Sequence, residues 1–139
     1  MTHELPADIY YQLIHTLRRC LPPPITNSPD DLARRDHAAI ARIAALHPAN
    51  AAEADLAALH VTASEQWKYC LRLAQQPAPS SDWAQKCRAQ ADAMMRESQS
   101  ALRLLLRMQA ARQKTGVNSA ARDRATWTEH PPSTSYLTA

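Results

Sequence analysis

Glycine is nearly absent from this chain, and its scarcity excludes several classes of nucleotide-binding protein. Among 139 residues there is one glycine, Gly116. A Rossmann fingerprint or a phosphate-binding loop needs several glycines, because its backbone must turn tightly and approach the phosphates closely. The sequence therefore excludes enzymes of those families.

Residues that favour β-strands are also scarce. The chain has no phenylalanine, two valines and five isoleucines, against fifteen leucines and twenty-seven alanines. Alanine and leucine favour helices, whereas β-branched and aromatic residues favour strands. This composition predicts an all-α fold. The length fits one ordinary domain, and 45% hydrophobic with 21% charged residues is the balance of a soluble globular protein.

Cysteines and apolar runs are too few for a disulfide scaffold or a membrane span. Cys20, Cys70 and Cys87 form an odd set without a CxxC pair, so we expect buried, reduced thiols. The longest apolar runs fall far short of the roughly 20 residues that a membrane-spanning helix needs. The first residues lack the basic and apolar regions of a secretory signal. We therefore expect a cytoplasmic protein.

The first part of the chain predicts two helices joined by a stiff linker. Pro6 suits the first turn of a helix, and apolar residues at steps of four continue to about Cys20. Three prolines at 22–24 end this helix, because proline lacks the N–H group that a helix needs. Ser28 then supplies an N-cap for a second helix, which we expect to end at about His47.

Two longer helices follow. Asn50 caps the third, with Glu53 three residues later as in a capping box, and its apolar steps reach about Gln75. Ser80 or Ser81 caps the fourth, whose apolar seam alternates steps of four and three as in a coiled coil. We expect these two helices to pair as a long antiparallel hairpin at the centre of a helical bundle.

Gly116 is the residue expected to end the fourth helix, just after Lys114, because glycine adopts the left-handed conformation common at helix ends. A short helix over about 118–130 and a flexible tail are expected to follow. The predicted organisation is therefore a helix and proline-rich linker over 1–24, a bundle core over 25–116, and a C-terminal segment over 117–139.

Positive charge is concentrated in the fourth helix and just beyond it. Residues 86–124 hold nine basic and three acidic side chains, within a total net charge of +3. At 100° per residue, four of the basic residues share a stripe about 40° wide, opposite the apolar seam. This basic stripe consists of Arg96, Arg103, Arg107 and Lys114. It predicts either a surface for phosphates or an acidic partner, or an ordinary solvated helix face.

Motifs for catalysis or metal binding are weak. None of the six histidines forms HxxxH or HExxH, or lies at ligand spacing from a cysteine, so we expect no metal site and no cofactor. His60 lies on the buried side of the third helix, where we expect a hydrogen-bonded core or boundary histidine. Ser98 lies in the apolar seam, where its hydroxyl can bond a backbone carbonyl one turn back. We expect no catalytic residue.

Several segments resemble small, alanine-rich helical proteins of bacteria. The segments are ARRDHAAIAR at 33–42, PANAAEA at 48–54, MMR at 94–96, LR at 102–103 and QAAR at 109–112. The resemblance covers about residues 30–130. It implies a bacterial cytoplasmic protein and no particular activity.

Binding is favoured over catalysis. The leading hypothesis is a small interaction or adaptor protein with a protein partner or a second copy of the chain, because alanine-rich seams bury little area per residue. The alternative is a nucleic-acid-associated regulatory protein that contacts phosphates through the basic stripe. An enzyme built from distant polar residues is the third hypothesis. We expect no membrane partner.

Overall fold

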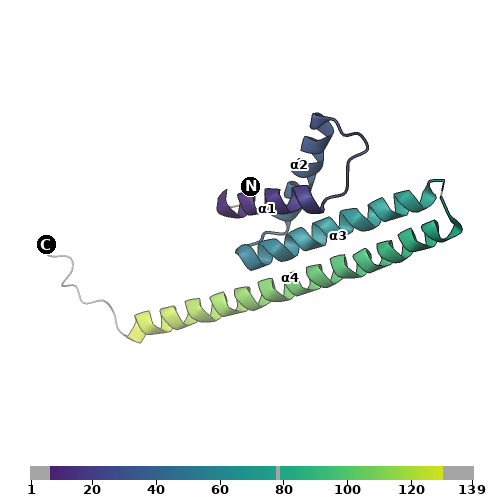
Figure 1. Ribbon diagram of the computed structural model, residues 1–139. Helices are drawn as coiled ribbons and strands as arrows, with labels where there is room; N and C mark the ends of the chain where they lie inside the picture. The colour runs from purple at the N-terminus through teal and green to yellow at the C-terminus, as the bar shows by residue number, and fades with distance from the viewer. Residues whose placement is uncertain (1–6, 78, 130–139) are drawn as a thin grey trace. The chain divides into compact units, whose positions relative to one another are not determined.

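The computed structural model describes residues 7–77 and 79–129, with side chains described as far as residue 116. Every regular element in this part of the chain is a helix, so the prediction of an all-α fold is confirmed. The helices are α1 (Ala7–Cys20), α2 (Pro29–Ala45), α3 (Ala51–Gln75) and α4 (Ser81–Glu129), shown in Figure 1. None of these helices, within the described residues, combines the length and apolarity needed to cross a membrane.

The chain divides into two units, Met1–Leu105 and Leu106–Ala139. The first unit contains α1, α2, α3 and the first half of α4, and it holds the core. The second unit contains the rest of α4.

The start of α2 follows the predicted cap, and its end comes slightly early. Ser28 Oγ accepts a hydrogen bond from the Asp31 N–H group at 3.2 Å. At the other end, the N–H groups of Leu46 and His47 bond to carbonyls three residues back, each at 3.0 Å. This tighter turn and the left-handed conformation of His47, with φ at 52°, end the helix at Ala45, two residues before the predicted position.

The start of α3 is a capping box of modified form. Asn50 Oδ1 accepts a hydrogen bond from the Glu53 N–H group at 2.9 Å. The Glu53 carboxylate accepts hydrogen bonds from Asn50 Nδ2 at 2.9 Å and from the Ala49 N–H group at 3.3 Å. Glu53 is only 1% exposed, so these bonds satisfy a buried acid. The cap predicted from the sequence is confirmed, and the return bond reaches one residue further out than in the usual motif.

The core lies where α1 and α2 pack against α3. Buried α1 residues recur at steps of four, and alanines on α3 allow the other helices to approach closely. Leu17, Ile43 and Leu105 are fully buried within this cluster. Its members are Ile9, Leu13, Leu17, Leu21, Ala39, Ile43, Ala54, Ala57, Ala58, Val61 and Leu105.

Within the first unit, α3 and α4 form the predicted antiparallel hairpin (Figure 1). Hydrogen bonds between His60 and Ser98 fix the register of the two helices. The α4 side of this contact is the predicted seam of alternating steps. Its buried members are Cys87, Ala91, Ser98, Ala101 and Leu105.

The prediction that the fourth helix ends at Gly116 is wrong. The helix continues through Gly116 to Glu129, so no separate short helix follows. The backbone of Gly116 is not left-handed, and its position is open, with nothing within 4 Å of an added Cβ. A glycine in a helix interior costs only about 1 kcal/mol relative to alanine, and the helix-forming residues on both sides outweigh that cost. The predicted tail over 131–139 lies outside the described residues.

Candidate functional site

The four residues of the basic stripe lie on α4, and all are exposed. Arg96 and Arg103 belong to the first unit, and Arg107 and Lys114 to the second. Among the residues whose side chains are described, no carboxylate forms an ion pair with any of the four. Their positive charge is therefore not neutralised within this part of the protein, which leaves it available to an anion.

His60 and Ser98 form a hydrogen-bonded contact between α3 and α4. His60 Nδ1 lies 2.9 Å from the Ser98 carbonyl oxygen and 2.9 Å from Ser98 Oγ. Ser98 Oγ also donates to the His60 carbonyl at 3.0 Å. The expectation of a hydrogen-bonded boundary histidine agrees with this contact. The predicted bond from the Ser98 hydroxyl to a carbonyl one turn back on its own helix is wrong. The hydroxyl bonds instead to the His60 carbonyl on α3, because the packing of the hairpin brings that acceptor within reach.

The geometry of this pair determines what it can do chemically. A carbonyl oxygen only accepts hydrogen bonds, so Nδ1 at 2.9 Å from the Ser98 carbonyl carries the proton. Nδ1 therefore donates to Ser98, and the Ser98 hydroxyl gives its own proton to the His60 carbonyl. A histidine that activates a serine must accept the hydroxyl proton, which is the reverse arrangement. The contact therefore joins α3 to α4 by hydrogen bonds. Serine and histidine also occur together as nucleophile and base in enzymes, but here the hydrogen bonds do not have the directions that such a pair needs.

The cysteines lie in two different environments. Cys20 is exposed, whereas Cys70 on α3 and Cys87 on α4 are buried, and all three are free. Burial raises the pKa of the Cys70 thiol, and the charge of Cys87 raises it further. A raised pKa favours the protonated thiol, which is a poor nucleophile and a poor metal ligand. Among the described residues, no group of three or more histidine, cysteine or acidic side chains could hold a metal ion.

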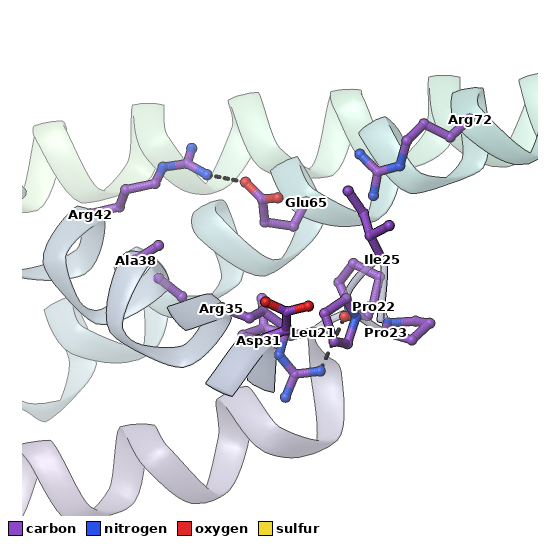
Figure 2. Close-up of a pocket in the computed structure, with 12 residues that line it drawn as sticks. Leu21, Pro22, Pro23, Ile25, Asp31, Arg35, Ala38, Arg42, Glu65 and Arg72 are labelled. Atoms are coloured by element: carbon purple, nitrogen blue, oxygen red, sulfur yellow. Dashed lines mark hydrogen bonds and ion pairs between the residues drawn. The ribbon is translucent and has the colours of Figure 1, made fainter. Parts of the chain in front are cut away.

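A surface cavity of about 340 Å³ lies between the proline-rich linker, α2 and α3 (Figure 2). This volume is within the range of small-molecule binding sites. The linker contributes Leu21, Pro22, Pro23, Pro24 and Ile25, α2 contributes Asp31, Arg35, Ala38, Ala39 and Arg42, and α3 contributes Glu65 and Arg72. The lining thus combines an apolar wall with five charged side chains.

Arg35 holds the proline-rich linker against α2 at the edge of this cavity. Its Nη1 donates to the Pro22 carbonyl at 3.1 Å, and its Nε and Nη2 donate to Asp36 Oδ1 at 3.1 and 3.0 Å. Only 17% of the Arg35 side chain is exposed. The bond to Pro22 holds the linker against α2, and the bonds to Asp36 orient the guanidinium.

The other two arginines of the cavity differ in their partners. Arg42 bonds to Glu65 through Nη1 and to Ser64 Oγ through Nη2, at 3.2 Å. Arg72 is exposed and forms no ion pair with a described carboxylate, and its guanidinium lies 5.8 Å from the centre of the Tyr69 ring. Arg72 is therefore the cavity arginine whose charge is not already paired.

No family model matches this chain. No curated protein and no solved structure matches it either. These comparisons do not bear on the resemblance to small alanine-rich bacterial proteins, which stays a prediction.

The cavity is the feature that the sequence does not reveal. Arg35 and Arg42 lie two turns apart on one face of α2, whereas Arg72 lies on α3, and only the packing of α2 against α3 brings all three to one opening. From the sequence, the prolines are expected to form a stiff linker between two helices, and nothing local shows that they line a cavity. One local signal existed, because an apolar residue, Ile25, directly follows the three prolines and lies outside the predicted helices.

Proposed function

We propose that this protein is a small, non-catalytic interaction or adaptor protein whose α3–α4 hairpin contacts a second copy of the chain. The proposal is supported chiefly by large apolar side chains exposed on both helices. Leu59 and Leu71 of α3 are 39% and 37% exposed, and Leu104 of α4 is 44% exposed. In the second unit Leu106 is 53% exposed. Large apolar side chains left exposed on a protein surface are candidates for burial in a protein contact.

The non-catalytic part of the proposal is supported by the His60–Ser98 contact. Within the described residues, His60 and Ser98 are in contact, and a serine beside a histidine is a common nucleophile and base in enzymes. The hydrogen bonds of this contact direct the serine proton to a backbone carbonyl, which holds the helices together and does not activate the hydroxyl.

Self-association should strengthen with added salt. Arg96 and Arg103 are exposed on the same helix as Leu104, so two copies that meet through α4 bring like charges together. Salt screens this repulsion and leaves the apolar contact intact. We expect a reversible monomer–dimer equilibrium in sedimentation velocity across a concentration series, with a lower dissociation constant at high salt than at low salt.

Leu104→Glu provides the test of the surface. Burying a carboxylate in the contact is expected to raise the dimer dissociation constant by tenfold or more, about 1.4 kcal/mol. Gln99→Glu is the matched control, because it adds the same charge at an exposed position on α4 and should leave the equilibrium nearly unchanged. A chain that stays monomeric at every concentration and salt, or equal effects of the two variants, would contradict the proposal.

The second candidate is a nucleic-acid-associated regulatory protein that contacts phosphates through the basic stripe. It is supported by the exposure of Arg96, Arg103, Arg107 and Lys114 and by their lack of carboxylate partners among the described side chains. Four phosphate contacts predict that affinity for duplex DNA falls about 100-fold between 50 and 200 mM salt. Fluorescence anisotropy of labelled duplex DNA and single-stranded RNA measures this.

Two charge-reversal double variants test whether binding depends on the basic stripe or only on the overall positive charge of α4. Arg103→Glu/Arg107→Glu should abolish binding, whereas Lys86→Glu/Arg88→Glu makes the same charge change on α4 outside the stripe and should weaken it only slightly. If neither nucleic acid binds at low salt, the stripe is a solvated face. Salt thus distinguishes the two candidates, because it strengthens the protein contact and weakens the phosphate contact.

The proposed location is the bacterial cytoplasm. It is supported by the resemblance of residues 30–130 to alanine-rich bacterial proteins and by three free cysteines, which suit a reducing compartment.

A further inference from the structure

We propose that the cavity between the proline-rich linker, α2 and α3 binds a small apolar molecule that carries one carboxylate. The cavity has a volume of about 340 Å³, at the lower end of the range for small-molecule sites. A ligand of that size, rather than a protein chain, matches the space. The inference is independent of the proposed protein contact, because none of the cavity residues lies on α4.

The apolar wall of the cavity favours an apolar ligand body. Pro22, Pro23 and Ile25 lie together at one side of the opening (Figure 2). The Ile25 side chain is 98% exposed, although isoleucine is among the residues most often buried. A bound apolar group would remove part of this side chain from water, which stabilises the complex by about 25 cal/mol for each Å² covered. The prolines make this wall stiff, so little conformational entropy is lost on binding.

The free charge of Arg72 favours an anionic group on the ligand. Arg35 and Arg42 already bond to carboxylates, whereas Arg72 has no carboxylate partner among the described residues. Arg72 and Ile25 both line this cavity, so one ligand can contact the apolar wall and the Arg72 guanidinium together. A planar guanidinium forms two parallel hydrogen bonds with a carboxylate, which suits that group better than a neutral one.

The acidic side chains of the lining limit the charge that the ligand carries. Asp31 and Glu65 both line the cavity. Asp31 is paired with Arg34 at 3.6 Å, and Glu65 is paired with Arg42 and, at 3.3 Å, with Lys68. The lining holds three arginines and two carboxylates, a net charge of +1, which one negative charge balances and a phosphate dianion exceeds. The charge balance therefore favours a monoanion.

The test is a titration with 4-phenylbutyrate, and with 4-phenylbutan-1-ol as a neutral probe of the same shape, followed by NMR of the Ile25 methyl groups. We expect saturable binding of the carboxylate at about 1 mM or tighter, with shifts at Ile25. The alcohol should bind at least tenfold more weakly, because it lacks the charge that pairs with Arg72.

Three variants locate the binding. Arg72→Gln removes the charge at an exposed position, so it should weaken carboxylate binding at least tenfold and leave alcohol binding unchanged. Ala38→Trp places a large side chain in the cavity and should abolish binding of both probes. Arg19→Gln removes an exposed charge on α1 away from the cavity lining and should change neither.

The proposal is overturned by any of three results. They are a lack of saturable carboxylate binding, equal affinity for the acid and the alcohol, and carboxylate binding that Arg72→Gln leaves unchanged. Because Arg72 is exposed, the variant should retain the folded structure, so this outcome does not depend on the more disruptive Ala38→Trp substitution.

Discussion

Leu17→Ala is expected to lower the free energy of unfolding by about 2 to 5 kcal/mol. Leu17 is fully buried in the cluster where α1 packs against α2 and α3. The substitution removes buried methyl groups and leaves a cavity that rigid helices do not fill completely. Urea denaturation followed by circular dichroism measures the change, from the midpoint and the slope of the transition.

Leu104→Ala is the matched control for this prediction. It deletes the same atoms from a leucine that is 44% exposed, so at protein concentrations low enough to keep the chain monomeric it should cost less than about 1 kcal/mol. A loss of less than about 1 kcal/mol for Leu17→Ala would show that α1 is not part of the cooperative core.

Ser98→Val is expected to lower the free energy of unfolding by about 2 to 4 kcal/mol, through two effects that add. The variant loses the hydroxyl that bonds His60 across the hairpin, and it places a larger branched side chain where Ser98 is only 4% exposed. Ser98→Ala removes the hydrogen bonds without added volume and should cost about 1 kcal/mol. Thermal and urea unfolding give both values.

Ser100→Val controls for helix propensity at a neighbouring position. Ser100 is exposed on the same helix, so its substitution should change the free energy of unfolding by no more than about 0.5 kcal/mol. A double-mutant cycle of Ser98→Ala with His60→Ala should give a coupling of at least about 0.5 kcal/mol. No coupling would mean that the two side chains do not interact in solution.

The sequence predicts local features of this fold well. Ser28 and Asn50 are correctly assigned as caps, because a cap depends on one side chain and the three residues after it. The buried faces of α1 and α4 follow from apolar spacing, since α-helical geometry repeats every 3.6 residues. On α3 the same spacing predicts that Ala52 and Leu59 are buried, which is wrong, because both are exposed and alanines such as Ala54 and Ala58 face the core instead. The antiparallel hairpin follows from two long helices with a short connection.

The end of α4 shows where local signals mislead. Gly116 is typical of a helix end, yet the helix continues to Glu129. Glycine permits a left-handed conformation but does not impose it, and the cost of keeping it helical is small. A single residue that merely allows two conformations does not determine which one the chain adopts.

What the sequence by itself determines about this protein is its all-α character, most helix boundaries, the buried faces of α1 and α4, and the position of the basic stripe along α4. Each depends on residues close together in the chain. Tertiary structure alone decided the pairing of His60 with Ser98, the bonds of Arg35 to Pro22 and of Arg42 to Glu65, and the place of Arg72 and Ile25 in one cavity. The reason is that these contacts join residues on different segments, and helix packing sets distances that no local pattern encodes.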